Sequence, residues 1–139
     1  MKVVLDTNVL ISATFWEGEA FHLLQLLENK KFTCFLSPAI LQEYVRIGNS
    51  LERAGKSMHR HASFKEAALK ISFLCSWVEP MRKVCVIVED PDDNKILECA
   101  IAAQTPVIVT YDKHLLKIKL FEGIAIISLT AFLALLEKK

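Results

Sequence analysis

The sequence predicts an α/β protein of three layers, in which helices cover both faces of a mainly parallel sheet of about five strands. Two observations lead to this prediction. Short runs of β-branched and other apolar residues alternate along the chain with longer segments whose apolar residues recur at helical spacing. In addition, the run at residues 84–88 is apolar throughout, which is typical of a parallel strand buried on both faces.

Strands are expected at the runs that are richest in β-branched and large apolar residues. They cover residues 2–5, 32–36, 84–88, 106–110 and 124–127. Helices are expected at residues 19–29, 38–47, 64–77, 90–104, 112–118 and 130–139. Ser37 and Pro38 are a typical start for the second helix, as N-cap and first helical residue, and Thr130 is expected to cap the last helix. Residues 48–61 are polar and are expected to form a loop.

The chain has 139 residues, of which 53% are hydrophobic and 24% charged, and this composition excludes a disordered or low-complexity protein. Such a length predicts a single domain, residues 1–139. The first apolar run is interrupted at Asp6, and no apolar stretch reaches the roughly 20 residues of a membrane-spanning helix. A cytoplasmic protein without membrane association is therefore expected. The four cysteines form no CxxC pair and lie in apolar runs, which favours buried free thiols over disulfides.

Charge is distributed unevenly along the chain, although the formal net charge is only +1. Residues 46–83 contain eight Lys or Arg and three Glu, a net charge of +5, and the remainder has a net charge of −4. A basic middle beside acidic flanks favours a polyanion that is brought to a metal-binding carboxylate site. A solvated basic helix face explains the same charges equally well.

Carboxylates follow several of the predicted strands at their carboxyl ends, where ligands bind in open α/β sheets. Asp6 follows the first strand and Asp112 follows the fourth. Asp92 and Asp93 begin the helix after the third strand, and Glu43 lies in the helix after the second. Each has a simpler explanation, because the aspartates could cap helices and Glu43 could lie on a solvated helix face. Their conjunction at one sheet edge favours a functional site.

Several carboxylates at one place are unfavourable without a cation. Two like charges about 4 Å apart repel by roughly 4 kcal/mol at an effective dielectric constant of about 20. A ligand set of oxygens favours Mg²⁺ or Mn²⁺ over zinc, which prefers His and Cys. Such ions lower the pKa of water and offset charge on phosphate oxygens. The acids therefore predict metal-dependent chemistry on phosphate esters.

Four segments, in order and spacing, resemble the motifs of PIN domains, and in particular those of VapC-like toxins from bacterial and archaeal toxin–antitoxin modules. They are residues 6–13 (DTNVLISA), 37–43 (SPAILQE), 90–100 (DPDDNKILECA) and 109–115 (VTYDKHL). The resemblance covers essentially the whole chain. It implies a five-stranded parallel sheet between helices and the activity of a metal-dependent ribonuclease.

The resemblance implies a quartet of acids that is catalytic and holds the metal: Asp6, Glu43, Asp93 and Asp112. Asp93 takes the third place in preference to Asp92, because Ala100 follows it by seven residues, as in the family pattern. Residues expected to support the site are Thr7, Asn8, Asp90, Asp92 and Thr110. The two threonine hydroxyls are expected to orient the acids. Tyr111 departs from the family, where a small residue often precedes the last Asp; it is expected to pack, with base stacking as the alternative.

The expected substrate is single-stranded or loop RNA, whose phosphates would contact the basic middle of the chain without reading its sequence. The residues expected to bind it are Arg46, Arg53, Lys56, Arg60, Lys65 and Lys70. The family resemblance further implies a small antitoxin protein that covers the acidic cleft, and a homodimer. Whether one or two ions of Mg²⁺ or Mn²⁺ bind stays open.

Other functions remain compatible with the sequence. A non-catalytic PIN-like module would bind RNA or a protein, although an intact acidic quartet argues against it. A PIN nuclease outside a toxin–antitoxin system would process RNA. An aspartyl-phosphate phosphatase resembles a D-x-D pattern after the first strand, but Asn8 occupies the third place here. A response-regulator receiver is disfavoured, because it would carry paired acids after the first strand.

Overall fold

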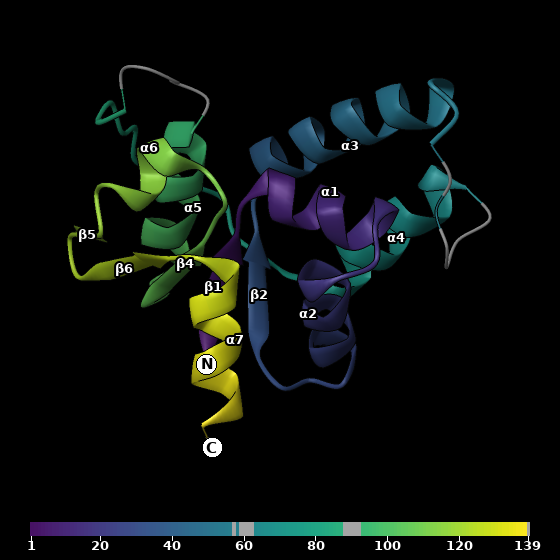
Figure 1. The fold of residues 1–139 in the computed structure, drawn as a ribbon. Coiled ribbons are helices and arrows are strands. Elements are labelled where there is room, and N and C mark those ends of the chain that lie inside the picture. The colour runs from purple at the N-terminus through teal and green to yellow at the C-terminus, as the bar shows by residue number, and fades with distance from the viewer. Residues whose placement is uncertain (57, 59–62, 88–92, 139) are drawn as a thin grey trace.

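The computed structural model describes residues 1–56, 58, 63–87 and 93–138, and within this part of the chain six strands form one sheet (Figure 1). The strands are β1 (Lys2–Leu5), β2 (Thr33–Leu36), β3 (Ser76–Trp77), β4 (Val107–Val109), β5 (Leu120–Phe121) and β6 (Ile124–Ile127). Their order across the sheet is β3-β2-β1-β4-β6-β5. The helices are α1 (Thr7–Phe15), α2 (Glu19–Glu28), α3 (Pro38–Arg53), α4 (Phe64–Leu74), α5 (Asn94–Ala103), α6 (Lys113–Leu116) and α7 (Leu129–Glu137).

The sheet is mainly parallel, which confirms the predicted fold class. Parallel pairing joins β3 to β2, β2 to β1, β1 to β4 and β4 to β6. The short edge strand β5, which the sequence did not predict, is antiparallel to β6. In the view of Figure 1, α5 and α6 lie to the left of strands β1 and β2. On the right of these strands lie α1, α2 and α4, and α3 crosses above. The architecture is the three-layer α/β/α arrangement.

Parallel pairing brings the carboxyl ends of the central strands to one edge of the sheet. Val3, Val4 and Leu5 of β1 are buried, as expected of a strand that is covered on both faces. The backbone N–H of Asp6 donates to the carbonyl of Val109 over 2.9 Å, so the chain leaves β1 directly beside the end of β4. This edge is where α1, α3 and α6 begin, and it is the edge that the sequence analysis selected for the site.

The predicted strand at residues 84–88 is wrong over residues 84–87, which form no strand; residue 88 lies outside the described residues. The reason is that side chains of α5, and not a neighbouring strand, form hydrogen bonds with the backbone of this segment. The N–H groups of Val86 and Ile87 donate to Oδ1 of Asn94 over 3.1 and 2.9 Å, and Nδ2 of Asn94 donates to the Ile87 carbonyl over 2.9 Å. The N–H of Val84 donates to Oε2 of Glu98 over 2.9 Å.

The sheet edge beyond β2 is formed by Ser76 and Trp77, which the sequence analysis assigned to the end of a helix. The helix in fact ends at Leu74.

The expectation of buried cysteines also needs correction: Cys34, Cys75 and Cys99 are buried, but Cys85 is exposed, and all four are free thiols. The cap of the last helix is Ser128, whose hydroxyl accepts the N–H of Ala131 over 3.1 Å.

The predicted loop at residues 48–61 is wrong for its first part, because α3 continues through Gly48 to Arg53. Glycine disfavours helix interiors, but here its missing side chain makes room for an aromatic ring. A Cβ at Gly48 would lie 1.9 Å from Cζ of Phe64, which is 1% exposed and starts α4. The ring of Phe64 packs against Tyr44 at 5.1 Å between centroids. Residues 57 and 59–62 of the predicted loop lie outside the described residues.

Among the described helices, none is long and apolar enough to cross a membrane.

Candidate functional site

Asp6 is the most buried acid of the predicted quartet that the structure describes, with 3% of its surface exposed. It stands between β1 and α1, at the N-cap position of the helix, yet its side chain makes no capping hydrogen bond. Instead, its Oδ2 accepts a hydrogen bond of 2.5 Å from the hydroxyl of Thr110, which follows β4. Capping therefore does not explain this aspartate, and the neighbouring strand fixes the orientation of its carboxylate.

The surroundings of Asp6 disfavour its charged form. Burial is the main cause that raises its pKa from 3.8 to about 6. The negative charges of Asp112 and Glu43 raise the pKa further, while hydrogen bonds from the Thr110 hydroxyl and the Thr7 backbone lower it. Three of the predicted acids are therefore close enough to interact electrostatically, and a bound cation would relieve their repulsion.

Asp112 is held rigidly at the start of α6. Its Oδ1 accepts the N–H groups of His114 and Leu115 over 2.6 and 3.4 Å, so this residue caps the helix, as its simpler explanation expected. Its own N–H donates to Oγ1 of Thr110 over 2.9 Å. The Thr110 hydroxyl thus joins the two acids, as donor to one side chain and acceptor from the backbone of the other.

Glu43 lies on α3 with 17% of its side chain exposed, and it is already paired with cations. Its Oε2 lies 3.3 Å from Nζ of Lys95 on α5 and 4.0 Å from Nη2 of Arg46. Lys95 was not among the functional residues predicted from the sequence. Its position in the sequence could have indicated it, because it follows Asp93 and Asn94 at the expected start of a helix. A cation is unfavourable there, since it opposes the helix dipole.

Asp93 is 8% exposed and occupies the N-cap position of α5 without a capping hydrogen bond from its side chain. The next residue, Asn94, holds the segment at residues 86–87 through its three hydrogen bonds, so the chain before the third motif is anchored to the start of α5. Asp90 and Asp92, which were expected to support the site, lie outside the described residues.

The donor set fits a divalent cation by its chemistry, since the described members of the quartet are all carboxylates and their mutual charge disfavours ionised Asp6. The predicted role of the Thr7 hydroxyl in orienting an acid is wrong for this structure, because in the described residues this buried hydroxyl has no hydrogen-bond partner. No three acid, His or Cys side chains of the described residues stand close enough to hold one ion together. Glu43, paired with Lys95, is one acid that would have to reorient.

Two other predicted neighbours of the site lie at the surface. Asn8 is exposed on α1. Tyr111 is 46% exposed and so does not pack in the core, but burial raises its pKa and a hydrogen bond with Ser12 lowers it. Its ring lines a small hollow of about 160 Å³ together with Trp16, which is 45% exposed.

The basic residues predicted to bind RNA are dispersed rather than gathered at the acids. Arg46 lies beside Glu43, whereas Lys70 pairs with Glu28 of α2. The Nζ of Lys56 lies 5.8 Å from the centroid of the Trp16 ring. Arg53 and Lys65 are exposed, and Arg60 lies outside the described residues.

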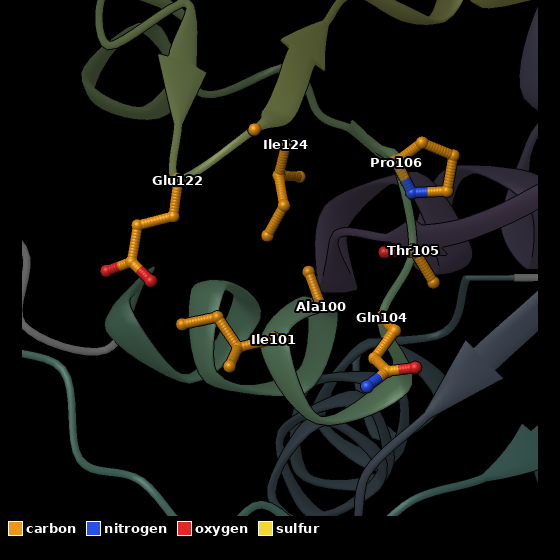
Figure 2. Close-up of a pocket in the computed structure, with 8 residues that line it drawn as sticks. Ala100, Ile101, Gln104, Thr105, Pro106, Glu122 and Ile124 are labelled. Atoms are coloured by element: carbon orange, nitrogen blue, oxygen red, sulfur yellow. The ribbon is translucent and has the colours of Figure 1, made fainter.

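A different hollow, of about 360 Å³, opens at the opposite edge of the sheet, where α5 ends and β4 and β6 begin (Figure 2). Glu122 is the one acid among the eight residues that line it. Both oxygens of this carboxylate accept hydrogen bonds of 2.6 Å from the guanidinium of Arg82. This hollow therefore lacks the acids that a metal site needs, and the carboxyl edge remains the candidate site.

Comparisons with known proteins agree with this fold. Residues 2–114 match the family model of the PIN domain. Among solved structures, PAE2754 from Pyrobaculum aerophilum is similar at a TM-score of 0.69 and 18% identity, over 100% of this chain and 91% of that one. VapBC2 from Rickettsia felis, bound to a DNA fragment from its promoter, is similar at a TM-score of 0.56 and 15% identity, over 92% and 98% of the two chains. No curated protein matches the chain in sequence.

Proposed function

The chain belongs to the PIN domain family, a family of nucleases, and from this premise we propose that it is a metal-dependent endoribonuclease that cleaves single-stranded or loop RNA. One observation carries the proposal. At the carboxyl edge of the sheet, the charges of Asp112 and Glu43 add to burial in raising the pKa of Asp6 to about 6. A buried acid with other acids around it is unfavourable for the stability of the fold, but it is a suitable ligand for a divalent cation.

Asp6, Glu43, Asp93 and Asp112 are the residues that would hold Mg²⁺ or Mn²⁺. The ion, when bound, supplies a Lewis acid that lowers the pKa of water and offsets negative charge on the phosphate. The Thr110 hydroxyl keeps Oδ2 of Asp6 in one orientation, and α6 keeps Asp112 in place through two backbone N–H groups. Hydrolysis then adds water across a P–O bond of the RNA strand.

The role within a cell is a finer part of the proposal. The likeness to the VapBC2 structure favours a toxin that acts in the cytoplasm and is held inactive by a small antitoxin protein. Large apolar side chains on the described surface, such as Phe73 at 84% exposure and Leu69 at 51%, are available for that partner or for a second copy of the chain. An RNA-processing nuclease outside such a pair would use the same acids.

The second candidate is a non-catalytic module that binds RNA or a protein. The ion pair between Glu43 and Lys95 favours it, because the ammonium occupies one of the carboxylates that a metal would need. The two candidates differ in whether RNA is cleaved.

Cleavage of a mixed pool of single-stranded RNA tests the proposal. We expect cleavage by the purified chain with Mn²⁺ or Mg²⁺, and none with EDTA or after Asp6→Asn. Glu137→Gln, a change of an exposed acid near the end of α7, serves as the matched control and should leave cleavage intact. RNA that is bound but not cleaved by the metal-loaded chain would contradict the nuclease and support the binding module.

A further inference from the structure

Lys95 is held in a position that is poor for stability. Its side chain is 20% exposed, and Nζ lies 3.3 Å from Oε2 of Glu43. It also lies in the first turn of α5, where the partial positive charge of a helix N-terminus repels a cation. An ammonium that is mostly buried and placed against a helix dipole is unfavourable unless an anion compensates it. Such a position suits the binding of a further anion.

A polar hollow of about 290 Å³ surrounds this ammonium. It is lined by Ala39, Gln42, Glu43, Arg46 and Lys95. Among these described lining residues, two cations face one carboxylate. The Arg46 side chain is 68% exposed and therefore accessible to a ligand from solvent, whereas Lys95 lies deeper. The amide of Gln42 adds a neutral hydrogen-bond donor.

The hollow adjoins the acidic site through a shared residue. Glu43 lines the hollow, and its charge also raises the pKa of Asp6. An anion bound by Lys95 and Arg46 would therefore lie beside the acids at the carboxyl edge. A nucleic-acid strand carries a negative phosphate at every nucleotide, so a strand that crosses this edge brings phosphates to both the hollow and the acids.

We propose that this hollow is a subsite for a backbone phosphate of the RNA strand, next to the bond that is cleaved. Lys95 and Arg46 bind the phosphate oxygens, and Glu43 holds the Lys95 ammonium in place while no phosphate is present. Glu43 thus competes with RNA for Lys95. The proposal rests on the proposed function in one respect, namely that RNA is the ligand.

This competition predicts that the loss of a carboxylate at the site increases the affinity for RNA. In EDTA, where no cleavage occurs, Glu43→Gln should bind a single-stranded RNA oligonucleotide several-fold more tightly than the unmodified chain, because the Glu43 carboxylate no longer competes with RNA for Lys95. Lys95→Met in the Glu43→Gln background should remove that gain. Lys95→Met alone and Arg46→Met alone should each lower the slope of log Kd against log salt by about 0.7, the value for one contact to a single strand.

Fluorescence anisotropy of a labelled oligonucleotide over a series of salt concentrations measures both quantities. Lys31→Met is the matched control, since Lys31 is exposed and precedes β2 at the opposite edge of the sheet. Lys95→Arg should retain the slope of log Kd against log salt, because the positive charge is kept. Arg46→Met changes an exposed side chain, so it tests the subsite without disturbing the fold. An equal gain from Glu43→Gln with and without Lys95 would overturn the subsite, as would slopes unchanged by both cation variants or an absence of RNA binding. Because the measurement needs no cleavage, the subsite and the nuclease can fail separately.

Discussion

The hydroxyl of Thr110 donates a hydrogen bond of 2.5 Å to Oδ2 of Asp6, across 104 residues of sequence. Its oxygen also accepts the backbone N–H of Asp112 over 2.9 Å. One buried side chain therefore orients the first acid of the site and fixes the start of the helix that carries the last. This arrangement depends on the parallel pairing of β1 with β4, which brings the ends of both strands together.

Thr110→Val should remove both contacts while it keeps the shape of the side chain. We expect the pKa of Asp6 to rise above about 6, because the hydroxyl hydrogen bond lowers it in the unmodified chain. The unpartnered N–H of Asp112 should lower the free energy of unfolding by about 1–3 kcal/mol. NMR titration of the Asp6 carboxyl and denaturant unfolding measure these effects. Thr110→Ser should restore both, and a pKa unchanged in the valine variant would rule out the role of the hydroxyl.

The raised pKa of Asp6 makes stability depend on pH in a defined direction. The folded protein holds this proton up to a pH of about 6, whereas the unfolded chain releases it near pH 3.8. The resulting stability is fully present below pH 3.8 and is lost as the pH rises through about 6. Asp6→Asn keeps a neutral side chain at every pH. Relative to the unmodified chain, the variant should therefore gain about 3 kcal/mol between pH 3.8 and pH 7, as the shift of about two units implies.

Denaturant unfolding in EDTA at several pH values checks this gain. A stability difference between Asp6→Asn and the unmodified chain that does not vary with pH would show that Asp6 is not perturbed.

Asp112 has two roles that substitutions can separate. Asn is as good an N-cap as Asp, so Asp112→Asn should retain the stability of α6 while it removes the charge proposed to bind metal. Asp112→Ala should lose both, with a decrease of about 0.5–2 kcal/mol in the free energy of unfolding. RNA cleavage and thermal unfolding, measured side by side, distinguish the two variants. Full cleavage by the asparagine variant would restrict Asp112 to capping.

Gly48 should not tolerate even the smallest side chain. Alanine is normally favoured over glycine within a helix by about 1 kcal/mol. Here the added Cβ would collide with Phe64, whose ring atoms would lie 1.9 to 2.5 Å away. We expect Gly48→Ala to lower the free energy of unfolding by about 1–3 kcal/mol, as overpacking does. Phe64→Leu in the same background should recover part of the loss; a stabilising Gly48→Ala would contradict the packing of α3 against α4.

The sequence predicted those parts of the molecule that depend on local patterns. The strands at β1, β2, β4 and β6 and the helix starts at Ser37 and Asp112 follow from apolar runs and capping residues. Asp6 and Asp112 were placed at one edge because parallel strands end there together.

The failures have long-range causes. The apolar run from residue 84 looks like a buried strand, but Asn94 and Glu98 on the following helix take its backbone hydrogen bonds. The helix α1 was not predicted as a separate element because its apolar residues do not form one face; most of it is buried. The pairing of Lys95 with Glu43 joins α5 to α3 over 52 residues, and no local pattern indicates it.

Calorimetric titration of the purified chain with Mn²⁺ at neutral pH tests whether the quartet of Asp6, Glu43, Asp93 and Asp112 binds a divalent cation. We expect saturable binding that weakens at least about tenfold after Asp6→Asn, Glu43→Gln, Asp93→Asn or Asp112→Asn, a loss typical of changes at a metal site. Glu137→Gln should leave the affinity unchanged. Binding of Mn²⁺ by the Asp6→Asn variant as tightly as by the unmodified chain would contradict a cation site at these acids.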